Sequence, residues 1–139
     1  MKFYGYKRSD GHVGIRNHVI VVPGVICASS VAQKIVNQVE GVQYLYNPNG
    51  CAQNSSDTAI TLEIISGMIA NGNVYGALIV GLGCEMIRED KYMEAIRKKT
   101  DKPVYYISIQ EEGGIKKTVE KGKEIVSMLK AEADKCVRE

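Results

Sequence analysis

Two short runs of consecutive apolar residues constrain the fold of this chain most strongly. Residues 19–22 read Val-Ile-Val-Val and residues 77–80 read Ala-Leu-Ile-Val, and a glycine follows each run closely. A continuous apolar run indicates a strand that is buried on both faces, whereas a strand with one wetted face alternates apolar and polar residues. Such strands belong mainly to parallel sheets, which need helical crossovers on both sides. The chain is therefore expected to have an α/β fold.

Extended and helical segments alternate along the rest of the sequence. Segments 42–46 and 104–109 are the other expected strands. Apolar residues spaced by three and four predict helices over 29–39, 55–70, 88–99 and from 115 onward, with serines 29–30 and 55–56 as candidate N-caps. The apolar face of the second helix comprises Ile60, Ile64, Ile65, Met68 and Ile69. The pattern predicts a three-layer, flavodoxin-like or Rossmann-like sheet of about four strands in the order 2-1-3-4.

The first 18 residues have a different character. Extended segments flank Ser9-Asp10-Gly11-His12, and Asp-Gly between extended runs is a strong signal for a tight hairpin. We expect an antiparallel hairpin that leads into the first strand and adds to the start of the sheet. The length of 139 residues fits one ordinary domain.

Composition excludes several classes of function. A net charge of +2, no Trp and one Phe argue against a nucleic-acid surface or a base-stacking platform. The longest apolar stretches fall well short of the ~18–20 residues that span a bilayer. The N-terminus has no apolar signal region, so we expect a cytoplasmic protein with free thiols rather than disulfides.

Three of the four cysteines follow successive expected strands. We use the term rim for the segments beyond the carboxyl ends of the strands, which are residues 23–27, 49–51, 83–85 and 110–114. Ligands of open parallel sheets bind at this edge, and Cys27, Cys51 and Cys84 should converge there. Thiolates suit iron, zinc or an iron–sulfur cluster, and nearby helix N-termini favour the thiolate form. The alternative is that these cysteines merely fill gaps beside glycine turns, and Cys136 lies outside the set.

Nucleotide binding has little support. Gly81-Leu82-Gly83 follows the third strand without a third glycine, and no Gly-Lys-Ser/Thr loop is present. Both histidines precede the first strand, so no Ser-His-Asp set can be argued. Glu85 is the carboxylate best placed for acid–base work or for metal binding.

Five segments occur in an order and spacing that is known from one family. They are Gly5-Tyr6-x-Arg8-x-Asp10-Gly11-x-Val13-Gly14-Ile15-Arg16-Asn17, then Cys27, Asn49-Gly50-Cys51, Gly81-Leu82-Gly83-Cys84-Glu85 and Ile109-Gln110-x-x-Gly113-Gly114. On these segments the chain resembles the altronate/galactarate dehydratase family, which includes the sulfolactate sulfo-lyase large subunit. The resemblance covers only the first domain of the catalytic region of those enzymes.

The resemblance implies a metal-assisted lyase that acts on small hydroxy-carboxylates. In such chemistry the proton beside a carboxylate is removed, a metal stabilises the enediolate-like intermediate, and a β-hydroxyl or sulfite departs. By position it implies Glu85, Asn49 and Gln110 as catalytic residues, Arg16 and Asn17 as substrate-binding residues, and Cys27, Cys51 and Cys84 as metal ligands. Where the family typically has a histidine four residues before Cys51, this chain has Asn47.

Two main hypotheses about the function follow from these observations. In the first, the chain is a domain of a metal-dependent lyase, incomplete without a further lyase domain or subunit and open to homo-oligomerisation. In the second, it is a non-catalytic, flavodoxin-like module that docks the remaining lyase polypeptide. A dinucleotide-binding oxidoreductase domain is a third reading. Arg16 and Asn17 precede the first strand and are expected at the edge opposite the rim. This position conflicts with a single site that contains both these residues and the rim cysteines.

Overall fold

The computed structural model describes all residues from 1 to 139 and has three layers. Its main sheet contains β3 (His18–Pro23), β4 (Gln43–Tyr44), β5 (Val74–Gly81) and β6 (Val104–Ser108). The strands are parallel and lie in the order β4-β3-β5-β6, which confirms the predicted order. Residues 19–22 and 77–80 form the centre of the sheet and are buried on both faces.

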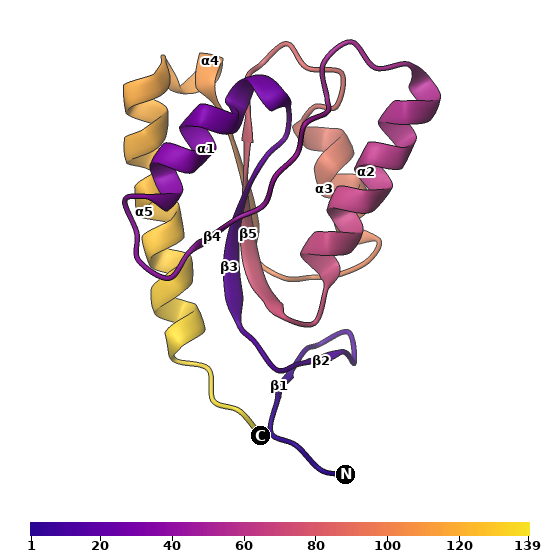
Figure 1. Ribbon diagram of the computed structural model, residues 1–139, viewed down its shortest axis with the longest axis vertical. Helices are drawn as coiled ribbons and strands as arrows, with labels where there is room; N and C mark the ends of the chain where they lie inside the picture. Colours follow the sequence, from indigo (N-terminus) through magenta and orange to yellow (C-terminus); the bar gives the residue numbers. More distant parts are fainter.

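Helices cover both faces of this sheet (Figure 1). One face is covered by α1 (Ser29–Val36) and α5 (Ile115–Asp134), and the other by α2 (Ser55–Ala70) and α3 (Glu89–Arg97). Two short helical segments lie at the rim, a 3-10 turn at Ile26–Ala28 and α4 (Ile109–Glu112). The buried apolar residues divide into a 15-residue cluster beneath α1 and α5 and an 11-residue cluster beneath α2 and α3. No helix is long and apolar enough to cross a membrane.

The N-terminal hairpin exists but does not join the main sheet. β1 (Tyr6–Lys7) and β2 (Val13–Gly14) form a separate two-stranded antiparallel sheet. After β2 the chain passes the start of β5. There the side chain of Asn73, the residue before β5, accepts hydrogen bonds from the backbone amides of Ile15 and Arg16. This side-chain contact takes the place of sheet pairing, so the expected extension of the sheet was wrong.

Several predicted helix ends need correction. α1 ends at Val36 rather than residue 39, and its first turn has no side-chain cap. The cap of α2 is Asn54 rather than a serine, because its side chain accepts a hydrogen bond of 2.9 Å from the Asp57 amide. Residue 109 begins α4 instead of ending the last strand, and Gly113 ends α4 in a left-handed conformation with φ 87°.

The predicted apolar face of α2 is only partly buried. Ile65 and Ile69 lie in the core, whereas Ile60, Ile64 and Met68 are 57%, 54% and 41% exposed. α2 packs mainly against α3 and β5, so the flank of the helix on the other side stays in solvent. The expectation that all these residues face inward was wrong for this flank.

Candidate functional site at the rim

The loops that carry Cys27 and Cys51 lie against each other. The Ile26 amide donates a 2.9 Å hydrogen bond to the Asn49 carbonyl. Gly50 has φ +98°, and a Cβ at this residue would lie 2.8 Å from the Gly24 carbonyl oxygen. Only glycine therefore permits this close approach of the two loops. The segments after β3 and β4 thus meet at the rim, as the sequence predicts.

The three rim thiols are exposed, and the thiols of Cys51 and Cys84 lie within electrostatic reach of Cys27. Partial desolvation raises the pKa of the Cys27 thiol, and the nearby thiols of Cys51 and Cys84 raise it further. The expectation that a helix N-terminus would lower thiol pKa values is therefore wrong for Cys27. No group of three or more Cys, His, Asp or Glu side chains is placed to hold a metal ion.

Cys84 lies on a loop that Glu85 holds in place. Residue Glu85 is only 6% exposed, and its carboxylate accepts hydrogen bonds from the Gly83 amide at 2.6 Å, from the Leu82 amide at 3.2 Å and from the Tyr106 hydroxyl. Burial opposes ionisation of Glu85, but these hydrogen bonds outweigh it and lower its pKa below the usual range. The same contact and burial raise the pKa of Tyr106. Glu85 is therefore an ionised carboxylate whose oxygens are already engaged.

Gln110 and Asn49 complete the polar groups of the rim. The backbone amide of Gln110 donates a hydrogen bond to the Leu82 carbonyl at 3.0 Å. The Gln110 side chain lies so close to Gly83 that a Cβ on Gly83 would be 2.5 Å from Gln110 Oε1. Asn49 is exposed beside Cys51. The structure thus brings Asn49 and Gln110 to the same end of the sheet as the cysteines.

An open hollow lies beside the Cys84 loop, between β6 and the start of α3. Its volume is about 470 Å³, and polar side chains line most of it. The lining residues are Gly83, Glu85, Arg88, Glu89, Asp90, Met93, Tyr106, Ser108 and Glu111. Arg88 is its single cation among four carboxylates, so this hollow alone is poorly suited to a dianionic ligand. The sequence analysis missed Tyr106 and Ser108, which only the β5–β6 register brings beside Glu85.

Asn47 has a structural role at the rim. It is 2% exposed, its side-chain amide donates to the Pro23 carbonyl at 2.9 Å, and its side-chain oxygen accepts from the Asn49 amide at 3.1 Å. These contacts fasten the Cys51 loop to the end of β3. Asn47, a neutral amide, therefore supports the loop and offers no base.

Arg16 and Asn17 lie at the opposite end of the sheet. They precede β3, whose six residues span about 20 Å along the strand. The Asn17 side chain donates to the Ala133 carbonyl near the end of α5, and Arg16 is exposed. The structure does not bring either residue to the rim.

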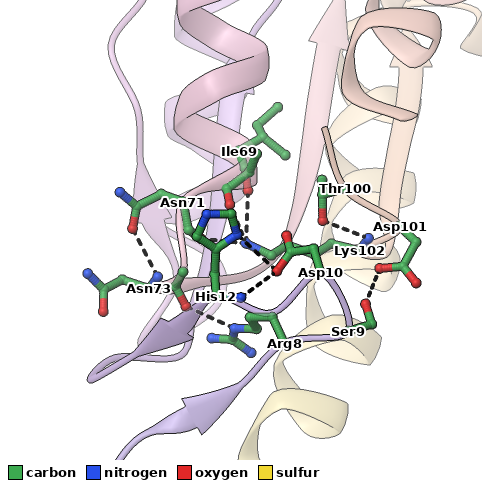
Figure 2. A network of polar contacts seen from close by, with 12 residues as sticks. Arg8, Ser9, Asp10, His12, Ile69, Asn71, Asn73, Thr100, Asp101 and Lys102 are labelled. Carbon is green, nitrogen blue, oxygen red and sulfur yellow. Dashed lines mark hydrogen bonds and ion pairs between the residues drawn. The ribbon is translucent and has the colours of Figure 1, made fainter. Parts of the chain in front are cut away.

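Figure 2 shows a polar network at that far end, whose Arg8 side chain also donates to the Arg16 carbonyl at 3.1 Å. Arg8 Nε donates to the Gly72 carbonyl at 2.8 Å, and Lys102 Nζ donates to the carbonyls that end α2. Burial lowers the pKa of Lys102 to about 8. This network joins the hairpin to the α2–β5 turn and to the chain before β6.

Comparisons with known proteins identify the family of this chain. A family model described as D-galactarate dehydratase/altronate hydrolase, second domain, matches residues 5–134. The chain belongs to this family. Within the family it is 34% identical over 111 residues to the (2R)-sulfolactate sulfo-lyase subunit beta of Chromohalobacter salexigens, an alignment that covers 80% of the chain and 28% of that protein.

Two further relatives are altronate dehydratases. The chain is 30% identical over 118 residues to the Bacillus subtilis protein, covering 78% of the chain and 24% of the relative. It is 26% identical over 117 residues to the Escherichia coli protein, covering 77% of the chain and 24% of the relative. The chain therefore spans about a quarter of the length of these relatives. It is a lyase-family α/β domain, as the resemblance implied.

Proposed function

We propose that this chain provides the cysteine-bearing half of the active site of a metal-dependent lyase. The single observation that carries the proposal is that the Cys51, Cys27 and Cys84 loops follow three neighbouring parallel strands, β4, β3 and β5, in a domain of this family. Its substrate class is a small hydroxy-carboxylate such as altronate, galactarate or sulfolactate, by analogy with the relatives' names.

The donor chemistry of the rim fits a thiophilic divalent metal, with iron as the leading candidate. Cys27, Cys51 and Cys84 would hold it, and because all three thiols are exposed their side chains are free to turn toward a common centre. A bound metal ion would supply stabilisation of negative charge on a substrate carboxylate as its α-proton leaves. Ferrous thiolate sites need a reducing compartment, which is why we assign the protein to the cytoplasm.

The chain's own polar residues have separate tasks in this proposal. The side-chain amides of Asn49 and Gln110 bind substrate oxygens at the rim, since amides donate and accept without a change of charge. Glu85 positions Cys84 by holding the loop from Gly81 to Glu85, because its carboxylate oxygens already accept hydrogen bonds. The base that removes the α-proton then comes from a further lyase domain or subunit.

A second candidate function has one specific observation in its favour. No histidine lies at the rim, and Asn47 and Glu85 are both engaged in structural hydrogen bonds. A rim that has no histidine and whose best-placed carboxylate, Glu85, is already engaged also fits a non-catalytic module that docks the remaining lyase polypeptide. Turnover of altronate, galactarate or sulfolactate by this chain alone would exclude that function.

Anaerobic metal analysis tests the leading proposal. The chain is loaded with ferrous iron under argon, desalted and analysed for bound iron, next to Cys84→Ser and Cys136→Ser. Cys136 lies beyond the end of α5, far from the rim, and serves as the matched control. We expect one iron per chain in the wild type and in Cys136→Ser, and loss of most of it in Cys84→Ser. Negligible iron in all three proteins would refute the metal site.

A further inference from the structure

An apolar strip runs along the solvent-facing flank of α2. It consists of Ile60, Ile64, Gly67 and Met68, which share one side of the helix at spacings of three and four. The three large side chains are 57%, 54% and 41% exposed. Gly67 faces open space, since a Cβ there would meet nothing within 4 Å. A second backbone can therefore approach the strip closely at this point.

The strip continues onto the open edge of the main sheet. β4 is the edge strand, and Tyr46, just beyond it, is 64% exposed. A mostly apolar hollow of about 240 Å³ lies between Met68 and Leu45, with Ile20 and Val74 in its wall. It is large enough to receive a side chain of a covering polypeptide. In Figure 1 this edge and the outer flank of α2 are covered by no other element.

The strip carries no charge of its own. Asp57 and Glu63 are the charged residues of α2, and Glu63 is paired with Lys99 of the neighbouring α3 end at 2.6 Å. Asp57, three residues before Ile60, is the one charge of α2 without an ion-pair partner, so apolar contact dominates over ionic contact on this flank. The occupant is expected to be an uncharged, apolar surface such as the flank of another helix.

The size of the strip indicates what kind of partner covers it. The strip spans nine residues of helix, from Ile60 to Met68, which is about 14 Å in length and about 10 Å in width and gives a footprint of about 140 Å². A stable dimer of free chains buries about 800 Å² on each partner, so the strip is too small for a second copy held by this contact alone. A partner that is also held elsewhere, as domains of one enzyme are, needs far less contact area here.

We infer that the α2 strip and the β4 edge are the docking surface for another domain of the lyase polypeptide. The lengths of the relatives agree, since about three quarters of each relative lies outside the part that matches this chain. The naming of the occupant as a lyase polypeptide rests on the proposed function. The location of the surface rests on exposure, charge and shape alone.

Site-specific photo-crosslinking tests this surface in the protein as its own cells make it. Benzoylphenylalanine replaces Ile64, the cells are irradiated, and the joined peptides are identified by mass spectrometry. We expect a peptide from a lyase-family polypeptide. This peptide should come from a part of that polypeptide that does not correspond to residues 5–134 of this chain. The control places the same probe at Met128 on α5, which is 40% exposed and should give no such product. The inference would be overturned by a product with a second copy of this chain, by a product with an unrelated protein, or by the absence of any product at position 64.

Two matched lysine variants provide a second readout. Met68→Lys and Met128→Lys each put a charge at a methionine that is 41% or 40% exposed on a helix surface. Met68→Lys should reduce recovery of the lyase partner with tagged chain about tenfold or more, because it buries an unpaired ammonium group, and Met128→Lys should not. Equal recovery with both variants would overturn the inference. Bound iron in the isolated chain reports on the rim separately, so failure of the docking surface and failure of the metal site can be told apart.

Discussion

Hydrogen bonds to Glu85 decide where Cys84 lies, so this carboxylate matters more for geometry than its position beside a cysteine suggests. Two amides of the loop and the Tyr106 hydroxyl converge on it. The contact is crowded, because a Cβ on Gly81 would lie 2.2 Å from Glu85 Oε1. A change at Glu85 should therefore loosen the β5–α3 loop as a unit.

Replacing this carboxylate should cost folding stability. In Glu85→Gln a side-chain NH₂ group faces a backbone amide, so at least one charge-assisted hydrogen bond is lost. We expect the free energy of unfolding to fall by about 1.5–3 kcal/mol. Urea unfolding followed by circular dichroism measures the change. Glu120→Gln, on the exposed side of α5, is the control and should stay within about 0.5 kcal/mol of the wild type.

The lowered pKa of Glu85 also predicts an acid-dependent loss of stability. Its folded-state pKa lies below its ordinary value of 4.5, so the unfolded chain binds more protons in this range. The stabilisation is fully present above pH 4.5 and is lost as the pH falls through the folded-state pKa. Thermal unfolding between pH 3 and 6 should show a shallower acid slope for Glu85→Gln than for the wild type. Parallel slopes would remove Glu85 from the acid response.

Sequence reasoning about single residues succeeded where the strand order alone decides the outcome. Cys27, Cys51 and Cys84 reach one rim because each follows a parallel strand. The role of Glu85 could not be predicted, because its partner Tyr106 lies 21 residues away and depends on the register that pairs Gly81 with Ser108. Asn47 could be recognised only as a departure from the family's histidine, and its two hydrogen bonds depend on loop contacts that leave no signal in the sequence.

At the scale of elements, the two glycines inside long helices provide a matched test of packing. Gly67 of α2 faces open space, whereas a Cβ on Gly122 of α5 would lie 2.3 Å from Ile35 Cδ1 of α1. Gly67→Ala should raise the unfolding free energy by about 0.5–1 kcal/mol through helix propensity. Gly122→Ala should lower it by about 1–3 kcal/mol, because the overpacking outweighs the same gain in propensity. Thermal unfolding of the isolated variants measures both, and changes of equal sign would contradict the α1–α5 packing.

The positions of helices and strands along the chain were predictable because apolar periodicity is a local property of the sequence. Which elements pack against each other was harder to predict. The range predicted for α2, 55–70, matches the structure. Its inward face did not match, because α2 leans on α3 and leaves one flank free. The hairpin was predicted from Asp-Gly, but its separation from the sheet depends on a contact with Asn73. This residue lies 58 residues after Ile15 and 57 residues after Arg16, the two residues whose amides it binds. Long-range side-chain contacts of this kind leave no periodic signal.

At the scale of the whole molecule, the two ends of the sheet have different tasks. The rim carries the candidate site, and the far end holds the N-terminal segment through Arg8 and Lys102 (Figure 2). The termini also meet there, since the backbones of Gly5 and Glu139 exchange two hydrogen bonds of 2.9 Å. Most of the long N-terminal motif therefore lies at the end of the sheet away from the cysteines.

This division predicts that changes at the two ends act independently. Arg8→Ala removes the hydrogen bonds to the Gly72 and Arg16 carbonyls and should cost about 1.5–3 kcal/mol. Arg8→Ala combined with Glu85→Gln should cost the sum of the two single changes within about 0.5 kcal/mol, because the sites are far apart and share no partner. Urea unfolding of the four proteins in the cycle measures this. A larger coupling energy would mean that the ends communicate through the sheet.

Metal binding at the rim should stabilise the entire fold, because the three cysteines belong to loops that come together only in the native chain. A metal ion at 100 times its dissociation constant adds about 2.7 kcal/mol, which for a domain of this size raises the midpoint of thermal unfolding by about 10 °C. Zn²⁺ added to reduced protein provides the probe without anaerobic handling. Cys27→Ser and Cys51→Ser should abolish most of this shift, and Cys136→Ser should retain it. If Zn²⁺ shifts all four proteins equally, or shifts none of them, the rim thiols do not act as a shared ligand set.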